Sequence, residues 1–404
     1  MTIPLKRALR SKGIRLVSLF VLYAFDWVWR KDKDLIVFTG LEGRWYTDNS
    51  RYLFERFVKD HSDRYRTIWV TRNEELIEEM NARPGYEGRF VHQYSAQGIA
   101  ALLSAKVVIN CFWTYDLPLL FSRRTTTVQL WHGIPIKAIG LQEKRLAGTG
   151  KNFIYQIWME SQYTYWVASS ETDKRTTMLC IGLPDDRVIV TGYPRNDTLV
   201  RQKDGPDGKA SLKMPCLSKT TILYAPTWRE NAVVRIFPFD DIDMTELDAL
   251  LEEFDAHLLL RGHYVDDVLG RNGEIDYGNL GSERVHLANR DLFEDVQELL
   301  PHVDVLISDY SGIWVDYLLL ERPIIFIPYD LEDYTRQTGL MYDYDEITPG
   351  PKVKGFSELT DALRAYLSEP SKDREERMRV KSMFHKYDDG RACERLYEFI
   401  SKRT

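Results

Sequence analysis

Short apolar runs alternate with amphipathic stretches along the first half of the chain. The apolar runs are rich in β-branched and aromatic residues, as in strands, whereas the stretches between them repeat their apolar residues with a helical period. We predict strands at residues 35–39, 67–71, 106–110, 125–130, 166–169 and 187–191, and helices at residues 51–59, 74–80, 96–104 and 171–179. This alternation predicts an α/β protein whose sheet is mostly parallel and carries helices on both faces.

A segment at residues 201–219 interrupts the alternation, because it is rich in Gly, Pro and Lys and has no apolar period. Such a composition is typical of a linker between folding units. Beyond it we predict strands at 221–225, 256–261, 285–288, 303–308 and 324–327, helices at 244–254, 292–300 and 313–320, and three further helical segments after residue 356. The sequence therefore predicts two similar α/β domains, at residues 34–205 and 206–404, with a cleft between them.

Residues 1–33 form a basic segment with eight Lys or Arg and two Asp. Within it, residues 16–25 are apolar except for Ser18, and this run is shorter than the roughly 20 residues that span a bilayer. Basic flanks, an apolar centre and nearby tryptophans favour a helix in the headgroup region of an anionic cytoplasmic leaflet. The alternative is a first helix docked on the protein's own core. A signal peptide is disfavoured, because no small-residue cleavage site follows.

The composition limits the class of protein. A chain of 404 residues with 44% hydrophobic and 28% charged residues is typical of a soluble globular protein of two or three domains. Because the formal net charge is −7, we do not expect nucleic acid as a partner. The four cysteines, Cys111, Cys180, Cys216 and Cys393, have no C-x-x-C spacing, so we expect neither a disulfide framework nor a zinc site and predict a reducing compartment.

The predicted strand at 303–308 ends in a small polar turn, Ser308-Asp309-Tyr310-Ser311-Gly312, which leads into a predicted helix. Backbone N–H groups at a helix start carry partial positive charge and favour a phosphate. We interpret the turn as an anion cradle. The alternative is that Asp309 and Ser311 only cap the following helix.

The predicted strand at 125–130 is followed at once by Trp131-His132-Gly133. A side chain at the carboxyl end of a parallel strand lies where open α/β sheets bind their ligands. With an ordinary pKa near 6.5, an imidazole suits proton abstraction from a hydroxyl at neutral pH. We take His132 as the candidate general base and Lys137 as a nearby cation for an anionic ligand, although a lone histidine is more often structural.

Another turn in the first half, Gly192-Tyr193-Pro194-Arg195-Asn196-Asp197, follows the strand at 187–191. We interpret Arg195 as facing the cleft and an acceptor phosphate, with Asn196 and Asp197 beside it. The alternative is a plain turn whose Asn-Asp pair caps the next helix.

Two strand ends of the second half carry further candidates. Thr227 and Arg229 follow the strand at 221–225 and are candidates for holding a base or a phosphate. Arg261 and His263 stand two apart where the strand at 256–261 ends, so both side chains project to the same side and both could reach one pyrophosphate.

Two D-x-D motifs, at residues 241–243 and 343–345, match a literal metal pattern. The first precedes a predicted helix, where acidic residues favour the positive end. We therefore do not expect a catalytic metal there.

Taken together, these motifs resemble the CDP-glycerol glycerophosphotransferase family, the teichoic acid primases and polymerases. The resemblance rests on WHGIPIKAIG (131–140), GYPRND (192–197), LYAPTWR (223–229), RGHY (261–264), LISDYSG (306–312), RPIIFIPYDLEDY (322–334), PGP (349–351) and FHKYDDG (384–390). The motifs cover the chain from about residue 131 to the end in the family's order. Ile134, Ile136 and Gly312 stand where other residues are common in the family, which bears on the choice of alditol more than on the reaction type.

The resemblance implies a GT-B-type fold of two facing Rossmann-like domains, CDP-glycerol as donor, and an undecaprenyl-diphosphate-linked acceptor on the cytoplasmic face of the cell membrane. His132 matches the family's proposed general base, while Arg261, His263 and the turn at 308–312 match its donor-diphosphate region. We expect no cofactor and no metal, and the oligomeric state stays open.

The hypothesis from the sequence is that an acceptor hydroxyl, deprotonated by His132, attacks the glycerol-bearing phosphorus and CMP leaves. A short amino extension is closer to the primase build than to polymerases with an extra amino-terminal domain. A CDP-glycerol or CDP-ribitol polymerase is the alternative within the family. Outside it, a nucleotide-sugar glycosyltransferase would share the fold, and a non-catalytic membrane-associated partner would keep the fold without turnover.

Overall fold

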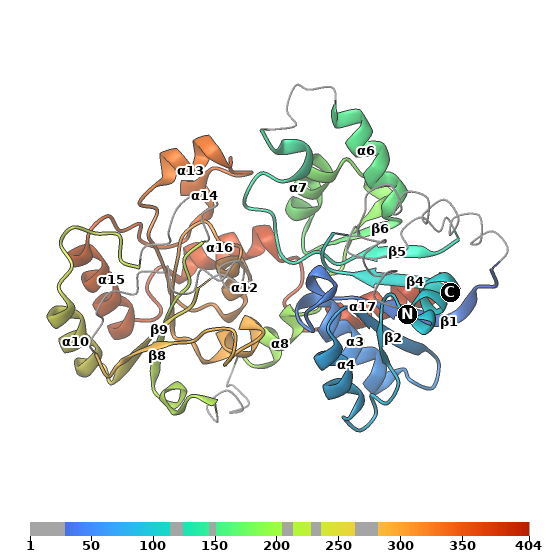
Figure 1. The fold of residues 1–404 in the computed structure, drawn as a ribbon. Helices are drawn as coiled ribbons and strands as arrows, with labels where there is room; N and C mark the ends of the chain where they lie inside the picture. Colours follow the sequence, from blue (N-terminus) through green and yellow to red (C-terminus); the bar gives the residue numbers. More distant parts are fainter. Residues whose placement is uncertain are drawn as a thin grey trace, which may run out of the picture.

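The computed structural model describes residues 29–113, 124–144, 151–203, 213–227, 236–262 and 282–403. Two parallel sheets, each flanked by helices, give an α/β architecture in which the two halves of the chain build one sheet each (Figure 1). The predicted boundary between residues 205 and 206, the amino-terminal segment up to residue 28, and candidates Arg229 and His263 lie outside the described residues. These parts of the hypothesis stay predictions.

The first sheet has the strand order β3-β2-β1-β4-β5-β6-β7, and every pair in it is parallel. Its strands are β1 (Asp32–Phe38), β2 (Arg66–Thr71), β3 (Phe90–His92), β4 (Ala105–Asn110), β5 (Thr126–Gln129), β6 (Tyr165–Ala168) and β7 (Val188–Val190). The chain changes direction across the sheet between β1 and β4, where Val37 pairs with Val108. The carboxyl ends of all these strands therefore meet at one edge, where such sheets bind ligands.

Helices cover both faces of this sheet because each carries an apolar stripe. They are α3 (Asp48–Asp60), α4 (Glu74–Asn81), α5 (Ala96–Ser104), α6 (Lys151–Gln162), α7 (Glu171–Ile181) and α8 (Asn196–Arg201). Side chains of Asn73, Ser95 and Ser170 accept hydrogen bonds from N–H groups in the first turns of α4, α5 and α7. Such caps fix where each helix begins.

The second sheet has the order β10-β9-β8-β11-β12 and is also parallel. Its strands are β8 (Thr220–Tyr224), β9 (Ala256–Leu260), β10 (Val285–Leu287), β11 (Val305–Ser308) and β12 (Ile324–Phe326). The helices of this half are α10 (Met244–Glu253), α12 (Ile313–Tyr317), α13 (Leu331–Gln337), α14 (Tyr344–Ile347) and α15 (Phe356–Ser368). β11 is buried along its whole length, as expected for a central strand with both faces covered.

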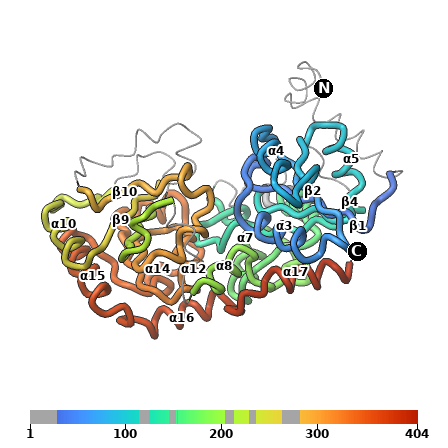
Figure 2. Tube along the Cα trace, turned by 90° about the horizontal axis from the view of Figure 1, so that it is seen from below, coloured from blue at the N-terminus to red at the C-terminus, as the bar shows by residue number. Residues whose placement is uncertain are grey.

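The carboxyl-terminal helices return to the first half of the chain. After α16 (Arg374–Phe384), α17 (Ala392–Ser401) packs against α3 and α8, and Figure 2 shows the red trace running along both halves. Asp197 fixes the start of α17, because its carboxylate accepts hydrogen bonds from the N–H groups of Ala392 and Cys393 at 2.8 and 2.9 Å. The end of the chain thus ties the two halves together.

Most predicted elements are confirmed within one to three residues, but the predicted helix at 292–300 is wrong. Two short 3-10 turns, η7 (Val296–Glu298) and η8 (Leu300–His302), stand there instead. Pro301 lies in the first turn of η8 and cannot donate the N–H that a continuous α-helix needs. The sequence patterns also missed β3, α6, α13 and α14, most of which are too short to show a period.

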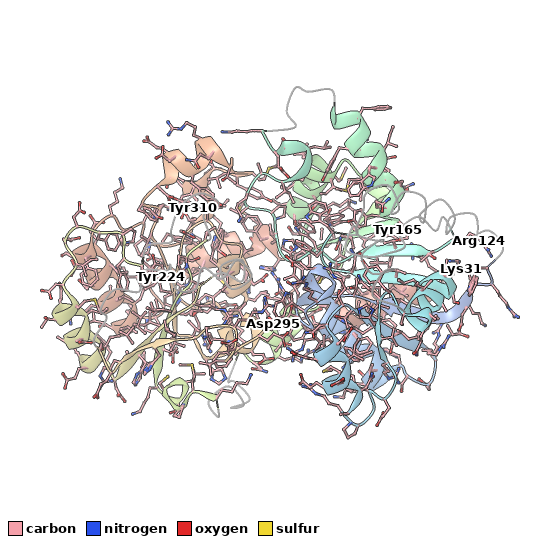
Figure 3. All side chains as sticks on the ribbon, viewed as in Figure 1. Lys31, Arg124, Tyr165, Tyr224, Asp295 and Tyr310 are labelled. Atoms are coloured by element: carbon pink, nitrogen blue, oxygen red, sulfur yellow. The ribbon has the colours of Figure 1, made fainter. Side chains whose placement is uncertain are left out.

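The last residues of the predicted membrane segment contact the end of α5. The Trp29 indole donates to Ser104 Oγ at 2.9 Å, and Lys31 Nζ donates to the Leu103 carbonyl at 2.7 Å. Arg124 donates to the Trp29 carbonyl, and Figure 3 places Lys31 and Arg124 beside each other at the edge of this half. The membrane association of residues 1–33 stays a prediction. None of the described helices has the length and apolar character to cross a bilayer.

Candidate active site

A cavity of about 470 Å³ opens between the two halves at the carboxyl ends of their strands. Its lining comes from both sheets and includes eight of the residues chosen from the sequence: His132, Lys137, Arg195, Thr227, Arg261, Tyr310, Ser311 and Gly312. Parallel strands that end at a common edge explain why turns so far apart in sequence meet here. The predicted cleft is therefore present.

The two central motifs are in contact across the cavity. A Cβ built on Gly312 would lie 3.4 Å from the carbonyl oxygen of Ile134, which belongs to the loop after His132. The same loop pairs with the second half through its backbone, since Met341 N–H donates to the Ile136 carbonyl at 2.9 Å and Ala138 N–H donates to the Gly339 carbonyl at 3.1 Å. These backbone bonds hold the histidine loop in register with the second half.

The turn that carries His132 has an unusual backbone. Trp131 has φ +55° and Gly133 has φ +129°, so a residue with a side chain would be strained at position 133. A Cβ on Gly133 would also lie 2.7 Å from the Arg195 guanidinium. Asn49 fixes this turn, because its side-chain amide donates to the Trp131 carbonyl at 2.8 Å and its oxygen accepts from the Arg195 N–H at 3.0 Å.

His132 is held as a neutral imidazole of defined tautomer. Its Nδ1 lies 3.3 Å from the Cys111 carbonyl oxygen, and because a carbonyl only accepts, Nδ1 carries the proton. Burial, together with the positive charges of Arg195 and Lys137, lowers the pKa of His132 to about 3. Nε2 therefore bears a lone pair at neutral pH, as a general base requires.

The sequence led us to expect Arg195 to bind an acceptor phosphate. In the structure its guanidinium binds two carboxylates instead. Nη1 donates to Asp48 Oδ2 at 2.9 Å and Nη2 donates to Asp316 Oδ2 at 2.5 Å. Asp48 belongs to α3 and Asp316 to α12, so this buried ion pair joins the two halves beside the cavity. The guanidinium already has two carboxylate partners, and its effect on an anionic ligand is reduced accordingly.

More carboxylates gather around this arginine than it can neutralise. Asp295, labelled in Figure 3 where the halves meet, accepts a hydrogen bond from the Asp48 N–H at 2.9 Å. Burial raises the pKa of the Asp48 carboxyl to about 6; Arg195 opposes this shift, whereas Asp295 and Asp316 add to it. The Gln297 amide also donates to Asp316 at 3.1 Å. None of these acidic residues was recognised from the sequence, because an acidic residue at a helix start resembles an ordinary cap.

The prediction that Asn196 and Asp197 face the cleft is corrected, because both residues have structural roles. Neither belongs to the cavity lining. Asn196 donates to Asp316 at 3.0 Å, and Asp197 holds the start of α17 through two backbone N–H groups. Both side chains point into buried contacts because the turn after β7 leads directly into α8.

On the donor side, the turn at 308–312 divides into an inner and an outer part. Asp309 is buried, and its Oδ1 accepts from the Thr227 N–H at 2.8 Å, the Tyr310 N–H at 2.7 Å and the Thr227 hydroxyl. Ser308 Oγ donates to the Ala225 carbonyl at 3.0 Å. Ser311 and Gly312 line the cavity, but Ser308 and Asp309 do not. The prediction that Ser308 and Asp309 contact a ligand directly is therefore corrected.

Arg261 lines the cavity but also organises the loop after β10. Nη1 donates to the Ala288 carbonyl at 2.8 Å and Nη2 donates to the Phe293 carbonyl at 2.8 Å. These bonds hold the segment that leads to Asp295. The guanidinium therefore shares its donors between the fold and the cavity.

The acidic D-x-D residues have structural partners. Asp241 accepts from the Phe356 N–H at 2.8 Å at the start of α15, and Asp243 and Asp343 cap α10 and α14. Among the described residues, the group of side chains arranged to hold a metal lies elsewhere, at Cys216, His257 and His286.

Comparison with known proteins gives a consistent result. The family model described as CDP-Glycerol:Poly(glycerophosphate) glycerophosphotransferase matches residues 21–402. A teichoic acid glycerol-phosphate transferase of Staphylococcus aureus is 31% identical over 387 residues, which cover 92% of this chain and 94% of that protein. A teichoic acid poly(glycerol phosphate) polymerase of Staphylococcus epidermidis is 28% identical over 384 residues, 91% of this chain and 50% of the polymerase.

Solved structures agree with the sequence relatives. A structure of the wall teichoic acid polymerase TagF superposes with a TM-score of 0.77 at 26% identity and covers 96% of this chain and 92% of that one. The match spans both sheets and the cavity between them. The chain therefore belongs to the CDP-glycerol:poly(glycerophosphate) glycerophosphotransferase family.

Proposed function

We propose that this enzyme transfers glycerol phosphate from CDP-glycerol to a hydroxyl of an undecaprenyl-diphosphate-linked saccharide, in a GT-B-type cleft, with release of CMP. The observation that carries the proposal is a neutral His132, its Nδ1 bound to a carbonyl, in the same cavity as Ser311 and Gly312. A base and an anion-binding turn are the two parts that a phosphoryl-group transfer needs. A TagF histidine-to-asparagine variant soaked with CDPG, a related solved structure at 25% identity, supports the choice of donor.

The reaction balances with the groups present. The acceptor hydroxyl gives its proton to His132 Nε2 while its oxygen forms a bond to the glycerol-bearing phosphorus. The bond from that phosphorus to the bridging oxygen breaks, and the oxygen leaves with CMP. Lys137, Arg261 and the turn at Ser311 and Gly312 face the added negative charge, so most of the rate enhancement comes from positioning and electrostatics.

Donor binding tunes the base. Burial, helped by the positive charges of Arg195 and Lys137, lowers the pKa of His132 to about 3, which makes the imidazole a weak base. A bound diphosphate places negative charge in the same cavity and offsets these cations. We expect the pKa of His132 to rise when CDP-glycerol binds, which brings the base toward its working range only when the donor is present.

The test is His132→Asn, because an asparagine amide can still donate to the Cys111 carbonyl but has no lone pair at the Nε2 position. We expect CMP release to fall by about 10²- to 10⁴-fold, the usual contribution of a general base. Calorimetric titration should show CDP-glycerol binding within about twofold of the wild-type protein. The matched control is His61→Asn, a histidine of the first half that does not line the cavity. A His132→Asn enzyme with normal turnover would exclude the imidazole from the reaction.

We infer that the enzyme acts as a primase, adding the first units to the acceptor. The support is the similarity to a teichoic acid glycerol-phosphate primase of Bacillus subtilis, which is 26% identical over 309 residues, 75% of this chain and 75% of that protein. Mass analysis of the product made from a synthetic lipid-linked disaccharide and CDP-glycerol decides the matter. One or a few added units support a primase, and a long ladder of products supports a polymerase.

We also propose that the protein binds the cytoplasmic face of the cell membrane as a peripheral protein. The support is the basic segment up to residue 28 together with Phe153 and Ile157 on α6, whose exposed fractions are 69% and 51%. Apolar side chains that project from a helix bind the headgroup boundary when basic groups add attraction to anionic lipid.

Co-sedimentation with anionic vesicles tests this proposal. Removal of residues 2–28 and, separately, Phe153→Ser with Ile157→Ser should each reduce the bound fraction while CDP-glycerol binding is kept. The matched control is Leu179→Ser on α7, another apolar side chain that is 59% exposed. Unchanged vesicle binding in both altered proteins would refute the membrane proposal without touching the transferase assignment.

A further inference from the structure

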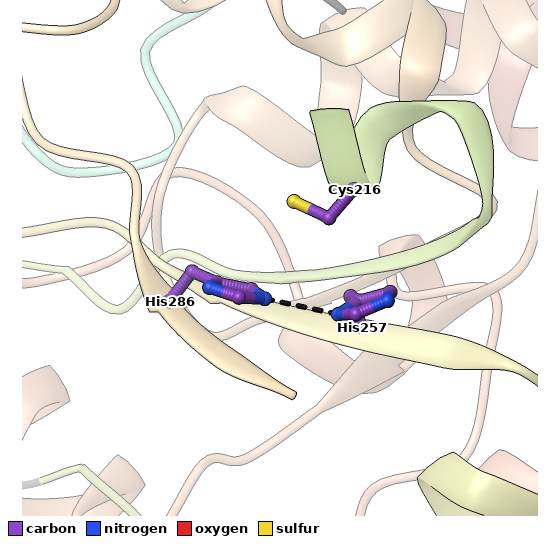
Figure 4. A group of neighbouring side chains, drawn as sticks. All are labelled: Cys216, His257 and His286. Atoms are coloured by element: carbon purple, nitrogen blue, oxygen red, sulfur yellow. Dashed lines mark hydrogen bonds between the residues drawn. The ribbon is translucent and has the colours of Figure 1, made fainter. Parts of the chain in front are cut away.

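Three side chains with metal-binding atoms converge at the amino-terminal end of the second sheet. Cys216 comes from η5 (Pro215–Ser218), His257 from β9 and His286 from β10. One ligand atom from each lies within 4.8 Å of those of the other two, and His257 Nδ1 is 2.9 Å from His286 Nε2. Figure 4 shows the Cys216 sulfur on one side of the two imidazoles.

The strand alternation explains why these groups share one face. Ala256, Leu258 and Leu260 of β9 pack on one side of the sheet, so His257 points to the other side, together with Leu259. His286 pairs in register with Leu259 on the neighbouring strand and therefore points the same way. Cys216 packs against this same core from the turn that precedes β8.

We propose that Cys216, His257 and His286 form a binding site for a divalent transition metal ion of the zinc class. One thiolate sulfur and two imidazole nitrogens are the donor atoms that zinc prefers in proteins. Three protein ligands leave a fourth position for water. The site is half-buried and β10 is an edge strand, so an ion reaches it from solvent.

The geometry needs only small side-chain rotations. Around a tetrahedral zinc with Zn–N near 2.0–2.1 Å and Zn–S near 2.3 Å, donor atoms stand roughly 3.4–3.6 Å apart. The two imidazole nitrogens are 2.9 Å apart because they share a hydrogen bond. A metal ion replaces that bond and separates the nitrogens by about 0.5 Å.

Burial favours the metal-binding form of the two histidines and opposes that of the thiol. Burial lowers the pKa of His257 and His286, so both rings are neutral at pH 7, and burial raises the pKa of the Cys216 thiol. One of the two facing nitrogens carries the proton of the His257–His286 hydrogen bond, so metal binding requires that ring to change tautomer and place its proton on the nitrogen that faces away from the metal. The thiol proton goes to solvent, so binding at pH 7 releases about one proton per ion. Arg284 and Lys219 lie near His257 and oppose a cation, while Asp255, bound to both, offsets them.

The site is separate from the cavity. His257 is the second residue of β9 and Arg261 follows the last one, so the strand places them about 13 Å apart at 3.3 Å per residue. The metal would fasten η5, at the end of the predicted linker, to the edge strand β10. We therefore expect stabilisation of the second half rather than a direct role in phosphate transfer.

The experiment titrates cobalt(II) into the metal-stripped, untagged full-length protein with a non-thiol reductant. We expect one equivalent of cobalt to give a thiolate-to-cobalt charge-transfer absorption, and zinc to displace it. Calorimetry in buffers of different ionisation enthalpy should show release of about one proton per ion. Zinc should also raise the thermal unfolding temperature.

Two independent variants keep the test decisive. Cys216→Ser should abolish the charge-transfer band, and His286→Gln on the edge strand should weaken binding by more than about 100-fold, since loss of an outer partner of a ligand already costs 10- to 100-fold. The matched control is His61→Gln in the first half, which should bind cobalt as the wild-type protein does. Absence of the band in the wild-type protein, or unchanged affinity in both folded variants, would refute the site and leave the His–His pair as a hydrogen bond only.

Discussion

The turns after β5 and after β11 both follow inner strands of parallel sheets, yet they use their polar side chains in opposite ways. The turn after β5 presents His132 to the cavity, with its backbone held by Asn49 and its Nδ1 by Cys111. The turn after β11 folds Asp309 inward, where it accepts bonds from Thr227 and Tyr310, and leaves Ser311 and Gly312 at the wall. Position at a strand end thus indicates a ligand site, but the local turn decides which side chain meets the ligand.

Replacement of Asp309 is the strongest test of whether this side chain is structural or contacts the ligand. We expect Asp309→Ala to lower the free energy of unfolding by about 3 kcal/mol, because two backbone N–H groups and a hydroxyl lose their buried acceptor. Asp309→Asn keeps an oxygen at this position and should cost less. Urea unfolding of both variants measures the difference. If the alanine variant is as stable as the wild-type protein and only donor binding suffers, Asp309 is a ligand contact after all.

The pH dependence of stability sharpens the contrast at His132. The unfolded imidazole titrates near 6.5 and the folded one at about 3, so between these values the unfolded chain binds more protons. The free energy of unfolding should therefore rise with pH across this window, by at most about 1.4 kcal/mol per unit. His132→Asn should remove this contribution. Urea unfolding of both proteins at pH 4.5 and 6.5 measures it.

Asp48 changes the pH dependence of stability in the opposite direction, so its contribution must be measured separately from that of His132. Its folded pKa of about 6 lies above the unfolded value of 3.8, so the native state binds more protons between these values. Stability from this group falls as the pH rises through that window. Asp48→Asn should therefore steepen the rise caused by His132. A pH profile that stays the same in both variants would show that neither group has the shifted pKa.

The smallest expected effect separates the two serines of the second turn. Ser308 donates to a buried carbonyl, so Ser308→Ala should cost about 1 kcal/mol of stability and leave donor affinity unchanged. Ser311 is at the cavity wall, so Ser311→Ala should weaken CDP-glycerol binding by about 3- to 10-fold, the usual effect of losing one hydrogen bond. The stability of this variant should be nearly unchanged. Thermal unfolding and calorimetric titration are the two measurements. If Ser308→Ala weakened donor binding and Ser311→Ala lowered stability, our assignment of the inner and outer parts of the turn would be wrong.

The sequence predicted most of the fold because strand and helix periods are local properties. The strand at 106–110 and the helix at 96–104 were placed almost residue for residue, since an apolar run and a Ser cap mark them. The pattern failed at 292–300, where Pro301 and the cap at Asp295 divide the segment into 3-10 turns. An apolar period alone does not report such interruptions.

The sequence predicted the location of the candidate site but not the role of each residue in it. His132, Lys137, Thr227 and Ser311 do line the cavity, because the carboxyl ends of parallel strands meet at one edge. Arg195 was misread, since its partners Asp48 and Asp316 lie 147 and 121 residues away in the chain. The zinc-class cluster escaped notice for the same reason, as Cys216, His257 and His286 have no recognisable spacing.

The alternation of elements, the family motifs and the turns where chemistry is possible can be recognised in the sequence. Which polar groups satisfy each other, and which remain at the cavity wall, depends on the folded chain. A buried charge must find a partner, and the partners of Arg195 lie more than 100 residues away in the chain. Local patterns cannot encode that pairing, so the roles of Arg195, Asp309 and Cys216 emerged from the folded chain.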